Sequence, residues 1–418
     1  MRPNNPFSAF WFFESRRHRD TEYRRILGEP SVPPCLCGSI HSYIRSMVST
    51  KNWYQLNAPD LIDTPALLVF PERVKHNINT AIKMVGDIDR LRPHVKTNKS
   101  PGAVCMMIEA GITKFKCATI AEAEMLGMIW AKDVLLAYQP TGPKLLRFIE
   151  LTQHYPNTVY SCLVDNMETA KEQAAAFANT GIQVPVYIDI NVGMNRTGIA
   201  PGPAVIELMK FLSQQSSIKS VGLHVYDGHI RNPEFAGKEK EVNDCYKPVE
   251  QLLKDIEAAG LAKPKIIVGG SPAFSVHCKR ENVECSPGTF VYWDKGYSDL
   301  CPEQDFLPAA VLMTRVISLP AAGLVTTDLG HKSVAAENEI GRRVFILDDE
   351  ELKAVSQSEE HLVLQNEGNK MYSPGDILYG LPFHVCPTVA LYERVITIEK
   401  GKQTGEWLNV ARDRKIGV

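Results

Sequence analysis

Short apolar runs alternate with amphipathic stretches along the chain from residue 61 to about residue 300. The runs cover 91–96, 114–118, 133–138, 159–164, 185–190, 221–225, 265–268 and 283–285. Between them, stretches such as 121–130, 167–178, 203–214 and 246–259 repeat apolar residues at helical spacing. Strands that alternate with helices predict a parallel sheet covered by helices, and eight strands in about 200 residues fit a closed (β/α)8 barrel of the TIM type. An open doubly wound sheet is the alternative, but no Gly-x-Gly-x-x-Gly fingerprint supports it.

The pattern changes after residue 305. Helical periodicity fades, and the runs 311–319, 323–328, 342–347, 361–364, 376–379 and 393–398 are typical of strands. Turn signals such as Ser-Pro-Gly-Asp at 373–376 separate these runs. We therefore expect an α/β chain in two parts, a barrel over 61–304 and a mostly antiparallel β domain over 305–418. The apolar segment 61–69 precedes the barrel and is a candidate to join the β domain.

Residues 1–46 differ from the rest of the chain, with Pro and Arg clusters and an aromatic patch at 10–13. The patch is too short for a secretory signal, and no small-residue cleavage site follows it. We interpret 1–46 as an extension that is disordered, or that a mispredicted start places ahead of Met47.

Composition argues against nucleic-acid-binding, membrane-spanning and disulfide-rich proteins. The formal net charge is −2 with 22% charged residues, which argues against a broad nucleic-acid surface. No apolar run approaches the roughly 20 residues of a membrane helix, so neither nucleic acid nor membrane is an expected partner. The 10 cysteines show no disulfide framework, and we expect reduced thiols in the cytoplasm.

Basic residues occupy the first expected barrel strand, Leu-Arg-Pro-His-Val-Lys at 91–96. Alternation along a strand places Arg92, His94 and Lys96 on one face. Lys96 falls near the carboxyl end of the strand, where barrels carry their catalytic residues. A lysine inside a barrel can lose its proton and form a Schiff base with an aldehyde. The alternative for Lys96 is a surface position on the barrel rim.

Two glycine-containing loops suit a charged cofactor. The segment 189–198, Asp-Ile-Asn-Val-Gly-Met-Asn-Arg-Thr-Gly, runs from a strand into a loop that presents Arg196 to a ring nitrogen or an anion. The run 265–268 is followed by Gly269, Gly270 and Ser271, which suit close approach of the backbone to a phosphate. The alternative for both segments is an ordinary turn that binds no ligand.

Histidines gather at two other points. The run 221–225 ends in a cluster of His224, Tyr226 and His229. Further on, His384 and Cys386 are two residues apart, and in an extended chain both side chains would project to one face. Imidazole and thiolate together suit zinc, although water, substrate or another residue must complete the ligand set. The alternative for the second pair is a buried cysteine beside a surface histidine.

Taken in order, these segments resemble the family of D-threonine aldolases and metal-dependent D-serine dehydratases, from about residue 61 to the carboxyl end. Arg-Pro-His-Val-Lys-Thr at 92–97 is similar to the family's motif for the lysine that binds pyridoxal 5′-phosphate (PLP). His-Val-Cys-Pro-Thr at 384–388 is similar to its metal motif, and the segments 284–289 and 328–332 also resemble the family. The resemblance implies an alanine-racemase-like PLP barrel (fold type III), a β domain, and a homodimer with its site at the interface.

The resemblance also implies roles for the cofactor residues. Lys96 would form the Schiff base with PLP, Arg196 would face the pyridine nitrogen, and Gly270 and Ser271 would face the phosphate. The other residues expected at the cofactor are His94, His224, Tyr226 and Gly269.

By the same resemblance, His384 and Cys386 would bind a divalent metal, and His229 would orient the substrate or a metal-bound water. The sulfur ligand favours zinc over manganese or magnesium. Aldolases of the family often carry Asp where this chain has Cys386, and dehydratases carry Cys, whereas the residues that follow look more like the aldolase branch. Asn98 is a second departure, at a position where the family has His.

Several reactions stay open at this point. The reading we favour is an aldolase that splits a β-hydroxy-D-amino acid, D-threonine to glycine and acetaldehyde. The alternative is a dehydratase of D-serine or D-threo-3-hydroxyaspartate, which releases ammonia and a keto acid. An amino-acid racemase would need a second base, and the sequence identifies none. A non-catalytic PLP-binding protein has no use for the metal pair, and a barrel without PLP would place Lys96 outside the cavity.

Overall fold

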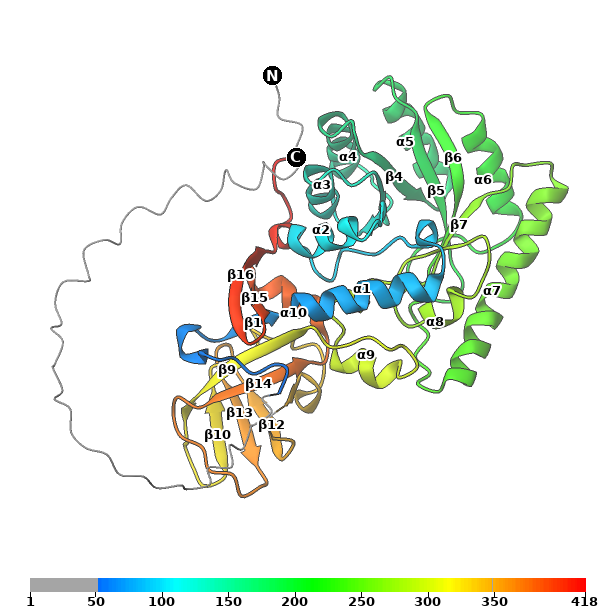
Figure 1. Ribbon diagram of the computed structural model, residues 1–418. Helices are drawn as coiled ribbons and strands as arrows, with labels where there is room; N and C mark the ends of the chain where they lie inside the picture. The colour runs from blue at the N-terminus through cyan, green and yellow to red at the C-terminus, as the bar shows by residue number, and fades with distance from the viewer. Residues whose placement is uncertain (1–51, 348) are drawn as a thin grey trace, which may run out of the picture. The chain divides into compact units, whose positions relative to one another are not determined.

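The computed structural model describes residues 52–347 and 349–418, so the interpretation of residues 1–46 lies outside the described residues. Two sheets organise this part of the chain (Figure 1). One is a parallel sheet of seven strands, and the other is a mostly antiparallel sheet of nine. The expected change from alternating elements to an antiparallel β domain is therefore confirmed.

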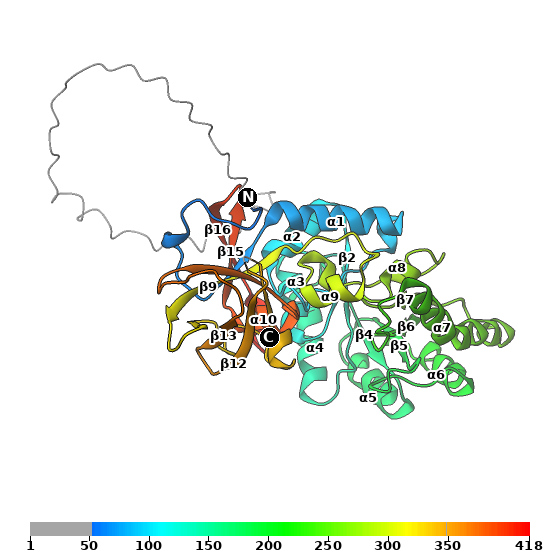
Figure 2. The same cartoon turned by 90° about the horizontal axis from the view of Figure 1, so that it is seen from below.

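The parallel sheet follows the order of the sequence from β2 to β8. Its strands are β2 (Lys114–Cys117), β3 (Asp133–Leu136), β4 (Val159–Val164), β5 (Val184–Ile190), β6 (Ile218–Val225), β7 (Lys265–Val268) and β8 (Glu284–Cys285). The helices of this part are α1 (Pro71–Val85), α2 (Pro101–Glu109), α3 (Ile120–Met128), α4 (Pro143–His154), α5 (Met167–Ala178), α6 (Pro203–Ser213), α7 (Phe235–Ala258), α8 (Phe274–His277) and α9 (Lys295–Leu300). Helices α3 to α7 lie on the outer side of the strands in both views (Figures 1 and 2).

Local sequence signals fix where these helices begin. Thr119 caps α3 by accepting the N–H of Glu122, and Asn166 caps α5 by accepting the N–H of Thr169. Helices α1, α2, α4 and α6 begin with proline, whose missing N–H costs nothing in the first turn.

The segment that precedes α2 closes the barrel, but it is not the regular strand that we expected over 91–96. Leu91 bridges to Cys285 of β8, and His94 bridges to Lys116 of β2. Pro93 has no N–H to continue a ladder, and the chain turns over residues 95–98. Lys96 therefore lies in a turn at the mouth of the barrel, and the strand alternation that we assumed does not extend to it.

Side chains fill the barrel in layers. At the amino ends of the strands, Arg92 is 1% exposed and pairs with Asp133 and Glu284, each at 2.7 Å. The next layer is apolar and consists of Leu135, Leu163, Tyr187 and Ile267. Lys116 pairs in register with Leu135, and His224 with Ile267, so buried polar groups begin at the level of this layer. Barrels place their sites from here towards the carboxyl ends.

The second sheet brings the first and last strands of the described chain together. Its strands are β1 (Ala66–Val69), β9 (Ala310–Ser318), β10 (Leu324–Thr327), β11 (Val344–Ile346), β12 (Leu352–Gln357), β13 (Leu362–Asn366), β14 (Ile377–Pro382), β15 (Arg394–Glu399) and β16 (Lys402–Leu408). Strand β1 pairs antiparallel with β9 and parallel with β15. Strands β12 and β16 were not expected, because both are largely exposed and carry few apolar residues. One helix, α10 (Val385–Leu391), follows β14.

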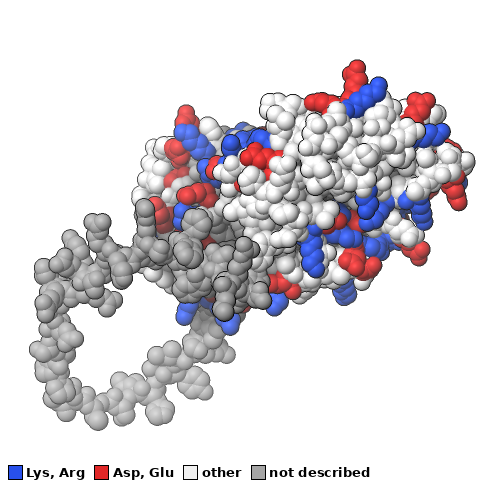
Figure 3. All heavy atoms as spheres, turned by 90° about the horizontal axis from the view of Figure 1, so that it is seen from above, with Lys and Arg blue, Asp and Glu red and all other residues white. Residues whose placement is uncertain are grey.

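Among the described residues, no helix combines the length and the apolar character that a bilayer crossing requires. On the face drawn in Figure 3, basic and acidic side chains are interspersed, and neither sign gathers into a continuous field.

Candidate active site

Lys96 lies half-buried at the mouth of the barrel, directly beside the β domain. Its backbone N–H donates to His94 Nδ1 at 3.2 Å. The next residue, Thr97, places its Oγ1 3.2 Å from Cys386 Sγ, and Thr289 Oγ1 is 3.7 Å from the same sulfur. The turn that carries Lys96 and the segment that carries the expected metal pair therefore meet in space, although about 290 residues separate them in sequence.

His384 and Cys386 do not lie in an extended chain, as we expected. His384 is the N-cap of α10, Cys386 lies in the first turn of that helix, and Pro387 follows where a helix tolerates proline. The buried carboxylate of Asp294 accepts the N–H of Val385 at 2.9 Å and fixes the start of the helix. The extended-chain argument was wrong, but the helix start still holds the imidazole and the thiol side by side.

The charges around this pair favour an ionised sulfur. Burial raises the pKa of the Cys386 thiol, but the hydrogen bond from His384 and the charge of Lys96 outweigh burial and lower it. Burial also lowers the pKa of His384, whereas Cys386 and the carboxylate of Glu337 outweigh it and raise that pKa to about 9. Glu337 Oε1 lies 2.5 Å from His384 Nδ1. Because Nδ1 is engaged by Glu337, Nε2 is the ring nitrogen that would bind a metal.

A second polar cluster lies inside the barrel. The carboxylate of Asp189 accepts a hydrogen bond from His224 Nδ1 at 2.7 Å, and both residues are buried. His224 Nε2 lies 3.4 Å from Lys116 Nζ, and burial, followed by the charge of Lys116, lowers the pKa of His224. The guanidinium of Arg196 lies 4.8 Å from the ring centre of Tyr226. Five of the expected cofactor residues thus lie close to one another: Lys96, His94, His224, Tyr226 and Arg196.

The Gly-Gly-Ser turn after β7 is buried and closely packed. Gly269 has a φ of +68°, which L side chains rarely adopt. A Cβ on Gly270 would lie 3.0 Å from the ring of Tyr226. Ser271 Oγ accepts the N–H groups of Gly288 and Thr289. Within the described residues, the N–H groups of Gly270 and Ser271 donate to no protein atom, which is the arrangement of an anion-binding turn.

His229 lies apart from the expected metal pair. Its Nε2 is 3.6 Å from Cys245 Sγ, and a Cβ on Gly193 would lie 3.1 Å from the same nitrogen. Among the described residues, no hydrogen bond or ion pair joins His229 to α10. It borders the loop of Arg196 instead.

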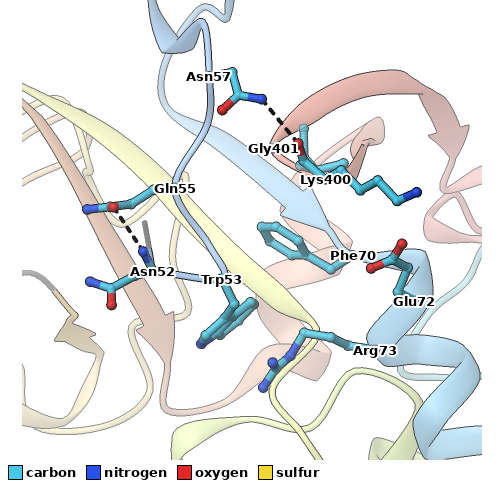
Figure 4. A pocket seen from close by; sticks show the side chains of 10 residues that line it. Asn52, Trp53, Gln55, Asn57, Phe70, Glu72, Arg73, Lys400 and Gly401 are labelled. Atoms are coloured by element: carbon cyan, nitrogen blue, oxygen red, sulfur yellow. Dashed lines mark hydrogen bonds between the residues drawn. The ribbon is translucent and has the colours of Figure 1, made fainter. Parts of the chain in front are cut away.

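A separate pocket of about 330 Å³ lies at the β-domain edge and involves none of the expected site residues. It is lined by Asn52, Trp53, Gln55, Asn57, Phe70, Glu72, Arg73, Ile398, Lys400 and Gly401 (Figure 4). The guanidinium of Arg73 lies 3.6 Å from the ring centre of Trp53 and closes one side.

Comparison with known proteins identifies the family. The model of the alanine racemase N-terminal domain matches residues 70–295, which is more than half of the chain. The chain belongs to this alanine-racemase-like family. A second model, the putative serine dehydratase domain, matches residues 309–398 and accounts for most of the β domain. The two matches confirm the resemblance found in the sequence.

Curated relatives and solved structures also resemble this chain. The D-threonine aldolase of Arthrobacter sp. is 24% identical over 364 residues, with 84% of this chain and 93% of the relative covered. The D-threo-3-hydroxyaspartate dehydratase of Delftia sp. is 25% identical, with 68% and 75% covered. The crystal structure of the D-threonine aldolase from Filomicrobium marinum superimposes with a TM-score of 0.78 at 23% identity, covering 84% of this chain and 96% of that one. This last similarity shows the shared fold.

The residues of this alanine-racemase-like chain fit PLP. A lysine at the barrel mouth suits the aldehyde of PLP. Two backbone N–H groups of a glycine turn, which donate to no protein atom among the described residues, suit its phosphate. An arginine beside an aromatic ring suits its pyridine ring. The metal pair fits a thiophilic divalent ion such as zinc by its donor atoms. Among the described residues no cluster of three or more His, Cys, Asp or Glu side chains is suited to a metal, so His384 and Cys386 leave positions for water or substrate.

Three residues of the site were not predicted from the sequence. Lys116 follows Lys114 at strand alternation in the short strand Lys-Phe-Lys-Cys, and this second inward lysine was the available signal. Thr97 is adjacent to Lys96, but only the fold brings it to Cys386. Glu337 comes from an irregular segment, and no sequence pattern links it to His384.

Proposed function

We propose that this chain is a lyase for β-hydroxy-D-amino acids that cleaves D-threonine to glycine and acetaldehyde with PLP and a divalent metal, preferably zinc. The contact between Thr97 Oγ1 and Cys386 Sγ carries the proposal, because it sets Lys96 beside sulfur and imidazole donors. The aldolase and dehydratase names of the relatives support the substrate class.

In this proposal each group of the chain has a defined task. Lys96 holds the cofactor, the turn of Gly269, Gly270 and Ser271 binds its phosphate, and Arg196 and Tyr226 border its ring. When bound, PLP supplies an electron sink for the charge on Cα, and the metal supplies a Lewis acid for the β-hydroxyl oxygen.

The protein side chains set the charge balance around these groups. His384 and Cys386 hold the metal, and Glu337 orients the imidazole of His384 through its Nδ1. Burial, and then the neighbouring lysines, keep the pKa of His94 well below its ordinary value, so His94 adds no second positive charge beside Lys96.

A dehydratase is the second candidate, and Cys386 favours it. The two reactions differ in the bond that breaks at Cα, the bond to Cβ in an aldolase and the bond to hydrogen in a dehydratase. Both need a Lewis acid at the β-oxygen, so the same residues serve either reaction.

The test is to incubate the purified protein, loaded with PLP and with zinc or manganese, separately with D-threonine, D-serine and L-threonine. We expect acetaldehyde and glycine from D-threonine, none from L-threonine, and loss of turnover with EDTA and in Lys96→Ala. Ammonia with pyruvate from D-serine, without acetaldehyde from D-threonine, would replace the aldolase by the dehydratase. Retained turnover in Lys96→Ala would overturn the site.

We also propose a homodimer and a cytoplasmic location. The open coordination positions at His384 and Cys386 leave room for a contribution from a second copy, and the cysteines in the described part of the chain are free thiols. Light scattering of the purified protein tests the dimer, and cell fractionation tests the location.

A further inference from the structure

Lys116 is a buried lysine without a carboxylate partner. It lies on β2 and is 2% exposed. Its ammonium nitrogen has one hydrogen-bonding contact among the described residues, His224 Nε2 at 3.4 Å. Lys238, which is equally buried, shows the usual solution, because its Nζ pairs with Glu303 at 2.8 Å. An unpaired buried ammonium is costly, so Lys116 has a reason other than packing to be a lysine.

The groups that face Lys116 come from each neighbouring element. Lys96, His94 and Arg92 lie on the closing segment, Asp189 on β5, and His224, Tyr226 and Asp227 on or just after β6. Burial first, and then the charge of Lys96, lower the pKa of Lys116 to about 7, against the weaker opposing effect of Asp189. At neutral pH the amine therefore exchanges readily between its charged and neutral forms.

The hydrogen bonds of His224 hold the amine in place. An ionised Asp189 can only accept, so His224 Nδ1 carries the hydrogen of the 2.7 Å bond between them. Nε2 of the neutral imidazole is then an acceptor, and Lys116 Nζ donates to it. Asp189, His224 and Lys116 form a chain in which the first two groups orient the third.

We propose that Lys116 is a second acid–base residue of the barrel chamber and exchanges a proton with Cα of the bound amino acid. The assignment rests on the proposed function, in which the nitrogen of Lys96 is occupied by the cofactor. The β-hydroxyl gives its proton to water as its oxygen forms the C=O bond of acetaldehyde, and the electron pair of the broken Cα–Cβ bond stays on Cα. The ammonium of Lys116 then gives one Nζ proton to Cα. Glycine forms, Lys116 keeps the electron pair as a neutral amine, and water returns the proton to it.

The first test observes the amine itself and needs no turnover. The holoprotein is labelled with [6-13C]lysine, and its ε-methylene signals are followed by NMR from pH 5.5 to 9. Because burial alone lowers the pKa of Lys116, we expect one signal to titrate below the ordinary lysine value and within this pH range, and to be missing in Lys116→Met. If the signal lost in Lys116→Met does not move between pH 5.5 and 9, as for a lysine at the ordinary value of about 10.4, the assignment is overturned.

The second test measures the proton transfer at Cα. Glycine is incubated with the holoprotein in 2H2O, and loss of its α-proton signal is followed by NMR. We expect Lys116→Met to slow this exchange by about 100-fold or more, and methylamine to restore part of it in Lys116→Ala. In the wild type, the exchange rate should rise with pH as Lys116 loses its proton below the ordinary lysine pKa, and Lys116→Met should lack this rise.

Lys114→Met is the matched control, because Lys114 lies on the same strand but pairs with Glu284 at the opposite end of the barrel. It should exchange glycine protons within about 3-fold of the wild type, and each variant should retain the visible absorbance of its cofactor. Unchanged exchange in Lys116→Met, or no exchange in the wild type, overturns the assignment. Exchange that depends on Lys116 without turnover of any β-hydroxy-D-amino acid overturns the proposed function alone.

Discussion

Replacing Lys116 by methionine should stabilise the apoprotein, and the gain should depend on pH. Methionine keeps the length of the buried stem but removes the nitrogen. Because the folded state lowers the pKa of Lys116 from 10.5 to about 7, the unfolded chain binds a proton more readily than the folded one. The cost of this lysine is therefore complete below pH 7 and disappears as the pH rises towards 10.5.

The size of the effect follows from the shift. At about 1.4 kcal/mol per pKa unit, the cost is on the order of 5 kcal/mol at pH 6 and about 2 kcal/mol at pH 9. Loss of the contact to His224 offsets a part of the gain, about 1 kcal/mol, at both pH values. The difference in stability between Lys116→Met and the wild type should thus shrink by more than half between pH 6 and pH 9.

The assay is the thermal unfolding midpoint of both apoproteins, measured by circular dichroism at intervals from pH 6 to pH 9. Comparing the two proteins at each pH cancels the titration of the groups that they share. Lys114→Met serves as control and should be less stable than the wild type throughout, because Glu284 loses a partner. A midpoint difference for Lys116→Met that is constant with pH, or that grows towards pH 9, would refute the reasoning.

Three further predictions concern the metal pair and the base of the barrel. Glu337→Gln should weaken zinc binding by about 10–100-fold in a competitive chelator titration, because His384 loses its orienting carboxylate, whereas the nearby Glu339→Gln should not. Equal affinities of the two variants would contradict this role. Removal of metal with EDTA should abolish turnover but leave the cofactor absorbance intact, and loss of both would show that the two sites are not separate. Arg92→Met should lower the free energy of unfolding by roughly 3–5 kcal/mol, measured by urea titration, because two partly buried carboxylates lose their cation; an unchanged midpoint would exclude a structural ion-pair layer.

Helical and strand periodicity predicted much of the architecture, because burial of one face imposes a repeat on the sequence. The expected helix over 167–178 coincides with α5, where Asn166 supplies the cap and every third or fourth position is buried. Periodicity gave wrong or no predictions where a proline interrupts a strand or where a strand has little buried surface. Pro93 interrupts the expected strand that leads to Lys96, and the exposed strand β16 offers little apolar signal.

The sequence predicted the individual motifs of the site but not which of their residues lie close together. Lys96 and Cys386 carry local signals, whereas their proximity depends on the packing of α10 against the closing turn. The role of Lys116 was not predicted, because it depends on a buried amine that has no carboxylate partner among the described residues. Only the fold shows which groups surround that amine. The pKa of a buried group depends on the neighbouring groups, and tertiary structure determines which groups these are.

The closing segment also sets the order in which this protein can mature. Arg92 and Glu284, which join the two ends of the barrel, are 192 residues apart, and Thr97 meets Cys386 across 289 residues. At a synthesis rate of roughly 5–20 residues per second, a ribosome needs about 10–40 seconds to make the first pair possible, and longer for the second. Until then the nascent chain has Lys96 but no closed chamber to hold an aldehyde. Cofactor capture therefore follows synthesis of the segments that contain Glu284 and Cys386.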